Sequence, residues 1–514
     1  MHELPALSRR QLLALAAPLF IRDARAADVP RFTMGVASGQ PRPDRLVLWT
    51  RLTGIDLPDS VHVQWELAHD EAFQRIAARG TESAEQAWAH SVHAEPGGLA
   101  PDRWYFYRFS ALGQRSAVGR TRTAPAADAP AKLRYSIASC QRWDHGHYAA
   151  WAHMARQEQD LVLFLGDYIY EYGSPANALR LHDGPLLRTL AQYRDRYAQY
   201  KSDPALQAAH AACPWLLVWD DHEVENDYAN QRGQTLQGEA MLQLRSAAYQ
   251  AYWEHQPFPK AWRPNGPDMR IYERYDWGRL ARIHALDDRQ YRDPQACIPA
   301  WRSGGATTVQ ARDCPELQDS RRTLLGAAQE RWLDEGWDAQ RPWNLLAQQT
   351  LMARASSRAV GGPDSGSDTS RDTGRYWTDG WDGYAPARRR LLASAVDRRV
   401  PNLVVLGGDV HAHYVADLKT DFDDAKSPVM ASEFCGSSIS SHGAAQSRVD
   451  EILKHNLHLH YGRSDQRGYI AFTLDERRLD AQLMVVAQPQ DAASPVQVAA
   501  RFSVEAGRPG PQRA

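Results

Sequence analysis

The sequence lacks the features that would point to nucleic acid or to a membrane as the main partner. No run of five or more basic or acidic residues occurs, and 60 Lys and Arg side chains nearly balance 62 Asp and Glu, for a formal charge of −2. A nucleic-acid-binding protein is therefore not expected. Beyond the first 26 residues no apolar segment reaches the ~20 residues that a membrane-spanning helix needs. The chain also shows no internal repeat.

Cysteine is scarce, and its number is odd. The sequence has five cysteines, at positions 140, 213, 297, 314 and 435. At least one of them should be unpaired if the protein enters an oxidising compartment. Cys297 and Cys314 enclose a short polar segment, so a local disulfide between them is plausible.

The first 26 residues predict export. Arg9 and Arg10 precede the short apolar run "QLLALAAPLFI", and "ARA" at 24–26 offers a small-residue cleavage site, as in a signal peptide. "SRRQLL" resembles a twin-arginine signal, which would make the twin-arginine translocase a partner during export and would place the protein in the periplasm or outside the cell. An ordinary buried N-terminal helix is the alternative.

The chain has 514 residues, of which 43% are apolar. This length exceeds what a single hydrophobic core usually fills, so about two domains are expected. Residues 27–125 contain short β-type segments such as "RLVLWTRL", "VHVQWEL" and "RWYFYRFSALG", separated by turns. They predict an all-β sandwich of the fibronectin type III or immunoglobulin-like kind. The Ala- and Pro-rich segment 121–132 is typical of a linker.

Residues 126–514 predict an α/β domain, because apolar runs alternate there with longer helical stretches such as 147–159 and 187–203. Buried strands are predicted at 133–139, 161–165, 215–219, 280–286, 343–349 and 402–406. The polar, glycine-rich segment 356–374 is predicted to be a long loop close to the functional site.

Four of these strands end in side chains that can bind a metal ion. The strand ends carry Cys140, Gly166-Asp167, Asp220-Asp221-His222 and the segment from Gly407 to His411. In an open α/β sheet the carboxyl ends of the strands face one crevice, so these residues are expected to converge. Several carboxylates, a thiol and imidazoles in one crevice would repel one another or resist burial unless cations held them.

Each piece has a simpler explanation when it is taken alone. A Gly-Asp pair after a strand is commonly a turn or a helix cap. "DDHE" is also compatible with a solvated acidic patch, and Cys140 with a buried small apolar residue. Their occurrence at four separate strand ends favours a metal site.

As a set, the motifs resemble one family. They are "FTMGVASGQPRPDRLVLWTRL", "SIASCQ", "LFLGDYIYEYG", "VWDDHEVENDYA", "ALDDRQYRDP", "NLLAQQTLM" and "LGGDVHAHY". Together with the export signal they resemble the PhoD-type alkaline phosphatases, relatives of the purple acid phosphatases among the calcineurin-like metallophosphoesterases. The resemblance covers nearly the whole chain. It implies an α/β metallophosphoesterase sandwich, with an active site at the strand ends, after the β-sandwich.

The resemblance also implies ferric iron (Fe3+) beside calcium (Ca2+). Asp167 matches an aspartate that bridges the two ions, Tyr170 an iron-bound phenolate and Cys140 an iron-bound thiolate. Asp221 matches a ligand of the second metal, and Asp220 either shares that ion or lies behind it. Charge on the metal would favour the deprotonated forms of the phenol and the thiol.

The remaining candidates lie in two motifs. Asp409 and His411 match the last metal motif, and the sequence does not decide which of them contacts iron. His222 matches the histidine that faces the substrate in related phosphoesterases, where it stabilises developing charge or protonates the leaving oxygen. His413 is an additional histidine near the site. Arg289 could contact phosphate or pair with a neighbouring aspartate at 287 or 288.

The expected reaction is hydrolysis of a phosphate ester by a metal-bound hydroxide, with release of inorganic phosphate. The residues do not distinguish monoesters from diesters, and a phosphodiesterase or phospholipase D-like activity remains open. A small phosphate ester is the expected substrate, with no substrate-binding residue assigned. An inert, calcium-dependent surface-binding protein is the alternative from another class.

Overall fold

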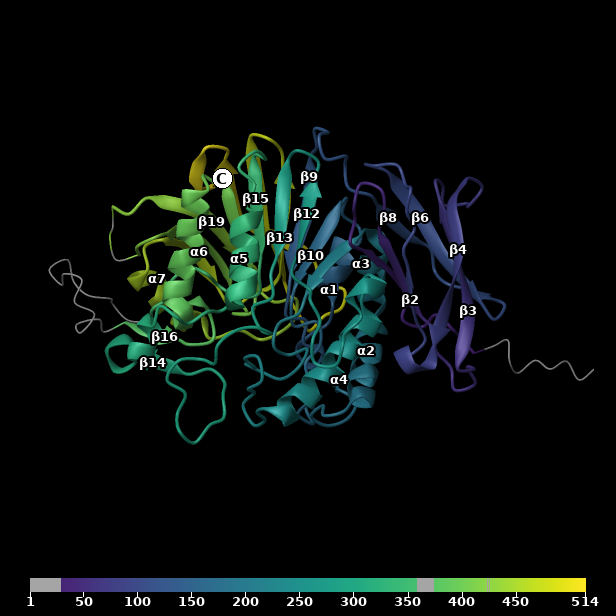
Figure 1. The fold of residues 1–514 in the computed structure, drawn as a ribbon, viewed down its shortest axis with the longest axis horizontal. Helices are drawn as coiled ribbons and strands as arrows, with labels where there is room; N and C mark the ends of the chain where they lie inside the picture. Colours follow the sequence, from purple (N-terminus) through teal and green to yellow (C-terminus); the bar gives the residue numbers. More distant parts are fainter. Residues whose placement is uncertain (1–28, 358–373, 423, 425) are drawn as a thin grey trace, which may run out of the picture.

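The computed structural model of the protein describes residues 29–357, 374–422, 424 and 426–514 (Figure 1). The export signal predicted over 1–26, and most of the loop predicted over 356–374, lie outside the described residues. Within the described part, no helix combines the length and the apolar character that crossing a membrane would require.

Two large sheets form the centre of the molecule. The first has ten strands in the order β24-β23-β22-β21-β9-β10-β11-β1-β2-β5. Its strands are β1 (Val36–Gly39), β2 (Val47–Arg51), β5 (Ser91–Ala94), β9 (Leu133–Ala138), β10 (Leu161–Leu165), β11 (Trp215–Val218), β21 (Arg467–Leu474), β22 (Arg478–Val486), β23 (Val496–Glu505) and β24 (Arg508–Arg513). β9, β10 and β11 are parallel, so their carboxyl ends lie at one edge of the sheet.

The second sheet has seven strands in the order β12-β13-β15-β17-β19-β18-β20. They are β12 (Glu273–Trp277), β13 (Ala281–Ala285), β15 (Trp343–Ala347), β17 (Leu403–Gly407), β18 (His413–Lys419), β19 (Val429–Cys435) and β20 (Leu459–Arg463). β13, β15, β17 and β19 run parallel to one another. All six strands that the sequence predicts for the α/β part are therefore present.

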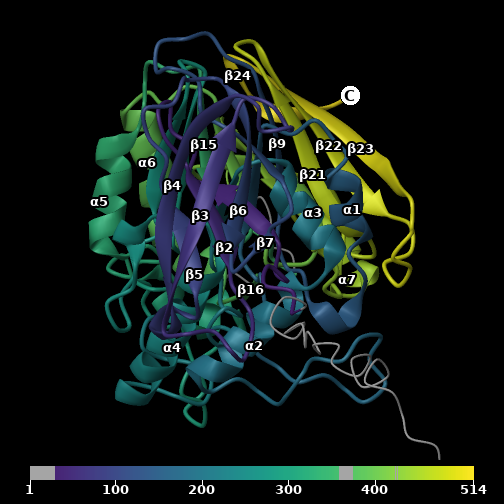
Figure 2. The same cartoon turned by 90° about the vertical axis from the view of Figure 1, so that its right-hand side faces the viewer.

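Helices cover both outer faces of this pair of sheets. They are α1 (Ala149–Met154), α2 (Leu190–Lys201), α3 (Pro204–Ala212), α4 (Glu239–His255), α5 (Gly326–Gly336), α6 (Ala385–Asp397) and α7 (Gln446–His455). Figure 2 shows α5 and α6 on one side of the molecule and α1 and α3 on the other. The helical stretches predicted at 147–159 and 187–203 contain α1 and α2.

Alternation along the buried strands explains how two cores form. In β17, Val404 and Leu406 belong to the core between the two sheets, whereas Leu403 and Val405 belong to the core under the helices α5 and α6. Successive side chains of a strand point to opposite faces, so a strand covered on both sides needs a continuous apolar run. This is the pattern that the sequence shows at 402–406.

The N-terminal segment forms a sandwich that shares one of its layers with the ten-stranded sheet. Its outer layer consists of β3 (Ser60–Ala68), β4 (Ile76–Glu85), β6 (Trp104–Ala111), β7 (Gln114–Arg115) and β8 (Gly119–Arg122). The inner layer is β1, β2 and β5, and apolar side chains of both layers form one buried cluster. β1 pairs in parallel with β11, with Gly39 opposite Trp215. The predicted boundary between residues 125 and 126 thus separates segments that share a sheet.

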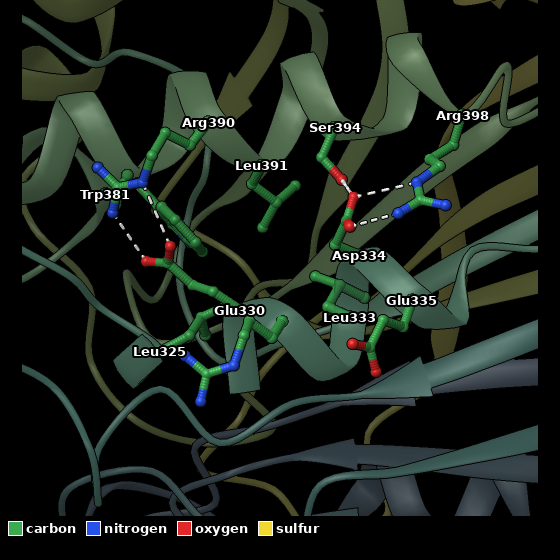
Figure 3. A pocket seen from close by; sticks show the side chains of 12 residues that line it. Leu325, Glu330, Leu333, Asp334, Glu335, Trp381, Arg390, Leu391, Ser394 and Arg398 are labelled. Atoms are coloured by element: carbon green, nitrogen blue, oxygen red, sulfur yellow. Dashed lines mark hydrogen bonds and ion pairs between the residues drawn. The ribbon is translucent and has the colours of Figure 1, made fainter. Parts of the chain in front are cut away.

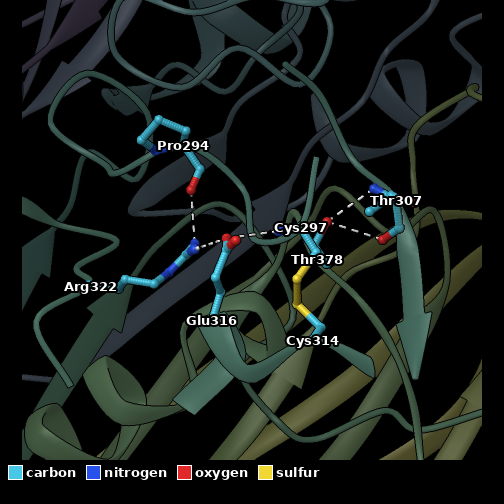
Figure 4. Close-up of a disulfide and its surroundings, with 7 residues drawn as sticks. All are labelled: Pro294, Cys297, Thr307, Cys314, Glu316, Arg322 and Thr378. Carbon is cyan, nitrogen blue, oxygen red and sulfur yellow. Dashed lines mark hydrogen bonds and ion pairs between the residues drawn. A yellow bond between two sulfur atoms is a disulfide. The ribbon is translucent and has the colours of Figure 1, made fainter. Parts of the chain in front are cut away.

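A small two-stranded sheet, β14 (Thr308–Gln310) and β16 (Arg375–Trp377), lies close to a disulfide. Cys297 and Cys314 are bonded as the sequence suggests, while Cys140, Cys213 and Cys435 are buried free thiols. Figure 4 shows Thr307 next to Thr378, and each donates a hydrogen bond to the other. The segment that includes the disulfide loop is thus attached to the strand pair.

Removing this disulfide should destabilise the protein. The two cysteines are 17 positions apart, and closing a loop of that size stabilises a folded state by about 3 kcal/mol. A Cys297→Ala, Cys314→Ala variant should lose about this much free energy of unfolding in urea titrations. The difference from the parent protein should disappear when both are measured in dithiothreitol. A difference that persists under reducing conditions would show that packing, not the cross-link, is responsible.

Candidate active site

The carboxyl ends of the parallel strands of both sheets meet at one edge, and all the candidate residues from the sequence lie there. Cys140 follows β9, Asp167 follows β10, Asp220 to His222 follow β11, and Asp409 follows β17. The two sheets come close at this edge, since a Cβ on Gly408, which follows β17 of the second sheet, would lie 2.4 Å from Oγ of Ser139, which follows β9 of the first. Only glycine permits this approach at position 408.

One group of possible ligands contains a thiol, a carboxylate, an imidazole and a phenol. Ligand atoms of Cys140, Asp167 and His411 all lie within 4.8 Å of one another. The Tyr170 hydroxyl donates to Asp167 Oδ2 at 2.8 Å and lies 3.1 Å from His411 Nε2. His411 Nδ1 is 2.7 Å from the carbonyl of His442, so Nδ1 carries the proton and Nε2 has its lone pair free for a metal.

A second group consists of carboxylates alone. Ligand oxygens of Asp220, Asp221 and Asp409 lie within 4.8 Å of one another. Asp221 also belongs to a group with Asp227 and Asp379, and to one with Asp167 and His222. The structure thus places Asp409 and His411, which the sequence could not separate, in different groups.

His222 lies between the two groups, and neighbouring side chains fix the orientation of its ring. Its Nδ1 is 2.7 Å from Glu171 Oε2, and its ring centroid is 4.1 Å from that of Tyr170. Glu171 is held in turn by the backbone N–H of Asn226 at 2.8 Å. Burial opposes protonation of His222, but the charges of Glu171 and Asp167 raise its pKa well above the ordinary value. The imidazole is therefore held as a hydrogen-bond donor.

Three of the four carboxylates resist ionisation in the absence of cations. Burial, with the nearby charges of Asp221 and Asp220, raises the pKa of Asp167 well above its ordinary value. Burial raises the pKa of Asp220 to about 7. Burial and the charge of Asp220 also raise the pKa of Asp409 well above its ordinary value. For Asp221, burial acts in the same direction, but the charges of Arg289 and His222 lower its pKa below the ordinary value.

The thiol and the phenol behave in the same way. Burial, followed by the charge of Asp167, raises the pKa values of the Cys140 thiol and the Tyr170 phenol well above their ordinary ranges. Burial lowers the pKa of His411 to about 3, so its imidazole is neutral. A cation bound here would displace the protons from the thiol, the phenol and the carboxylates.

Unsatisfied oxygens provide the test of whether the residues fit metal ions. Among the described residues, Asp220 Oδ2, Asp221 Oδ1 and Asp409 Oδ2 are buried oxygens without a hydrogen-bond partner. Buried polar atoms are rarely left unpaired, and three carboxylate oxygens together in one cleft form an obvious position for a cation. The donor set therefore fits bound metal ions.

Several candidate ligands have backbone conformations that few residues adopt. Cys140, Asp167, Asp409 and His411 have positive φ angles of 58°, 60°, 64° and 51°. Non-glycine residues in this region are uncommon and are found at sites where the surroundings enforce them. Gly166, with φ of 104°, precedes Asp167, and a Cβ there would lie 2.4 Å from Asp220 Cβ. The strand-end turns are thus shaped to direct the side chains into the cleft.

Two further residues, which the sequence does not single out, organise the site. Glu223 accepts hydrogen bonds from the backbone N–H groups of Asp167 and Asp220, at 3.1 and 2.8 Å, and thereby ties two strand ends together. Ser441 Oγ lies 2.8 Å from the Tyr170 oxygen. A glutamate after "DDH" and a serine in a serine-rich loop carry no distinctive signal in a single sequence.

Arg289 takes a partner that the sequence did not suggest. Its Nε donates to Asp220 Oδ1 at 2.5 Å, and its Nη1 pairs with Asp379 at 2.7 Å, instead of pairing with Asp287 or Asp288. Arg289 is fully buried, and its positive charge compensates part of the negative charge of the acidic group. His413 is also buried, and its Nδ1 accepts the N–H of Ser437 at 3.1 Å, which gives it a structural role.

A cavity of about 320 Å3 opens directly over the metal-ligand groups. Its floor includes Asp167, Asp221, His222, Asp409 and His411. The other walls come from α7, from β14 and β16 and from the segment after β15. A small molecule can therefore reach the strand ends from solvent.

Two sheets covered by helices, with acids and histidines at the strand ends, define a purple acid phosphatase-like fold. A purple acid phosphatase, PPD1 from yellow lupin (Lupinus luteus) seeds, shares this fold with a TM-score of 0.53 at 12% identity, over 91% of this chain and 74% of that one.

The chain belongs to the PhoD-like phosphatase family and is a phosphoric ester hydrolase. Residues 135–483 match the family model for the PhoD-like phosphatase, and residues 16–125 match that for the N-terminal domain of PhoD-like phosphatases. Alkaline phosphatase D of Bacillus subtilis (strain 168) is 41% identical over 499 residues, which covers 93% of this chain and 82% of that protein. A solved structure of PhoD superposes with a TM-score of 0.86 at 40% identity, covering 94% of this chain and 92% of the other.

Proposed function

We propose that the protein is a metal-dependent alkaline phosphatase that uses iron and calcium to hydrolyse phosphate esters. The observation that supports this most strongly is the pair of adjoining ligand groups with unsatisfied carboxylate oxygens. Cys140, Tyr170 and His411 offer sulfur, phenolate and imidazole ligands, which suit a transition metal such as ferric iron. Asp220, Asp221 and Asp409 offer only oxygen, which suits calcium.

Asp167 is proposed to bridge the two ions, because its carboxylate belongs to two ligand clusters. It shares one group with Cys140 and His411 and another with Asp221 and His222. When bound, the metals would supply positive charge to the phosphoryl oxygens and an activated water for the attack on phosphorus.

The chain's own contribution to catalysis is assigned to His222. Nδ1 is engaged by Glu171, so Nε2 is the nitrogen available to a substrate in the cavity. A proton on Nε2 can stabilise negative charge on a phosphoryl oxygen or pass to the leaving alkoxide. Glu171 fixes the orientation of the ring and favours its protonated state.

Export to the periplasm or beyond the cell through the twin-arginine translocase is part of the proposal. It is supported by Arg9, Arg10 and the small-residue site at 24–26. The disulfide between Cys297 and Cys314 is compatible with an oxidising compartment.

Chelation of calcium tests the metal assignment directly. Because calcium binds through oxygen ligands and exchanges readily, EGTA should abolish hydrolysis of p-nitrophenyl phosphate, and added calcium should restore it while iron stays bound. The check is metal analysis of the same samples before and after EGTA. Full activity of a protein freed of calcium and iron would rule out the proposal. Parallel assays with bis-p-nitrophenyl phosphate would show whether diesters are also substrates.

A further inference from the structure

The wall of the cavity above the metal-ligand groups differs in character from its floor. Its apolar part includes Leu351, Trp377, Val410, Val449 and Ile452. Leu351 and Val449 are largely buried in the protein and present only a small surface. A phosphate group would be bound by the floor, so this apolar wall would contact the organic part of the ester.

Among the residues that the structure describes, two arginines are the only charged side chains that line the cavity besides its aspartates and histidines. Arg375 begins β16, and Arg448 lies on α7. Both are exposed, and in the described part of the chain neither guanidinium takes part in an ion pair or a hydrogen bond. The backbone of Arg375 is fixed by Ser356, whose Oγ accepts its N–H at 3.0 Å.

Another cavity is lined by arginines that are already paired with carboxylates. It has a volume of about 430 Å3 and lies between α5 and α6 (Figure 3). There Arg390 pairs with Glu330 at 2.9 Å, and Arg398 pairs with Asp334 at 2.6 Å. These pairs bridge the two helices, and both guanidinium groups are already engaged by carboxylates.

We propose that Arg375 and Arg448 form a subsite for a second anionic group, so that the enzyme prefers phosphate esters that carry another phosphate beyond an apolar spacer. The inference rests on the proposed function, because it places the scissile phosphate on the floor of the same cavity. Guanidinium groups bind phosphate through short, charge-assisted hydrogen bonds. The apolar wall accommodates the carbon chain between the two phosphates, and the metal groups and the arginines bind its two ends.

Substrates of graded length test the subsite. Alkyl phosphates of two to six carbons are compared with the matching α,ω-bisphosphates. Two identical scissile groups give a twofold statistical advantage, and charged hydrogen bonds at the far end should raise the preference in kcat/KM to about tenfold at the best chain length. In an Arg375→Gln, Arg448→Gln variant this preference should fall to about twofold. Lys454→Gln on α7, which removes a charge paired with Glu451 outside the cavity, should retain it.

Direct binding separates the subsite from the catalytic proposal. Calorimetric titration with alkylphosphonates and α,ω-alkanebisphosphonates, which are not hydrolysed, should show the same preference in the parent protein and its loss in the arginine variant. An equal loss for both ligand classes would show that the arginines only attract anions at long range and would overturn the subsite. Absence of any preference in the parent protein would overturn it as well. Failure to hydrolyse all the esters, with the binding preference intact, would contradict the proposed function and leave the subsite standing.

Discussion

Replacing His222 with alanine should reduce kcat on the order of 10²-fold or more, the size expected when one general acid or oxyanion donor is removed. The imidazole is oriented by Glu171 at 2.7 Å and lines the cavity, so the variant loses a donor that is fixed before substrate binds. Metal content and melting temperature should stay close to those of the parent protein. Steady-state kinetics, metal analysis and thermal unfolding of the same preparation measure all three.

Leaving groups distinguish the two possible roles of His222. If its proton passes to the leaving oxygen, the defect should shrink for good leaving groups such as p-nitrophenolate. If it stabilises charge on phosphorus, the defect should be similar for all esters. Glu171→Gln serves as the matched comparison, because it keeps the hydrogen bond but removes the charge, and it should cause a smaller loss. Should His222→Ala instead strip a metal ion from the protein, His222 would be a ligand and not a catalytic residue.

Replacing Asp167 with asparagine should have opposite effects on the metal-loaded and the metal-free protein. With metals, the variant should bind less of both ions, lose activity by on the order of 10³-fold and melt at a lower temperature, because bound metal stabilises the folded state by mass action. Without metals, the variant should be at least as stable as the parent. Burial and the charges of Asp221 and Asp220 raise the pKa of Asp167, so at neutral pH the metal-free protein folds only with uptake of a proton by this carboxylate, a cost that asparagine does not have.

Melting temperatures of both proteins, measured with metals and after complete chelation, provide the check. Asp397→Asn, an exposed change at the end of α6, should alter neither state and controls for the loss of one carboxylate. Added metals should raise the melting temperature of the parent protein much more than that of the variant. If added metals raise the two melting temperatures equally, Asp167 does not bind the ions, and the bridging assignment fails.

The sequence predicts the strand ends well because each combines a continuous apolar run with a ligand-type residue. Asp167, Asp221 and Asp409 follow buried strands, and the parallel arrangement of those strands brings them together. Cys140 also follows a buried strand, but only the family resemblance assigned Cys140 and Tyr170 as iron ligands.

Long-range hydrogen bonding accounts for what the sequence could not predict. Arg289 pairs with Asp220, which is far from it in the chain, and short-range pairing with its neighbours looked equally reasonable. Glu223 acts through backbone N–H groups of two separate strand ends. The positive φ angles of Asp167 and Asp409 cannot be predicted from the residue type, because aspartate occurs in every kind of turn.

The parallel pairing of β1 with β11 links the first strands of the chain to the assembly of the catalytic cleft. Without β1, β2 and β5, strand β11 would be an exposed edge, open to pairing with other chains. β11 leads directly to Asp220, Asp221 and His222, so the order of these residues depends on a contact between segments far apart in the chain. Such contacts form slowly, because a large loop must close first. We therefore expect the N-terminal strands to cover an edge that could otherwise pair with other chains, and the metal-binding edge to be completed late in folding.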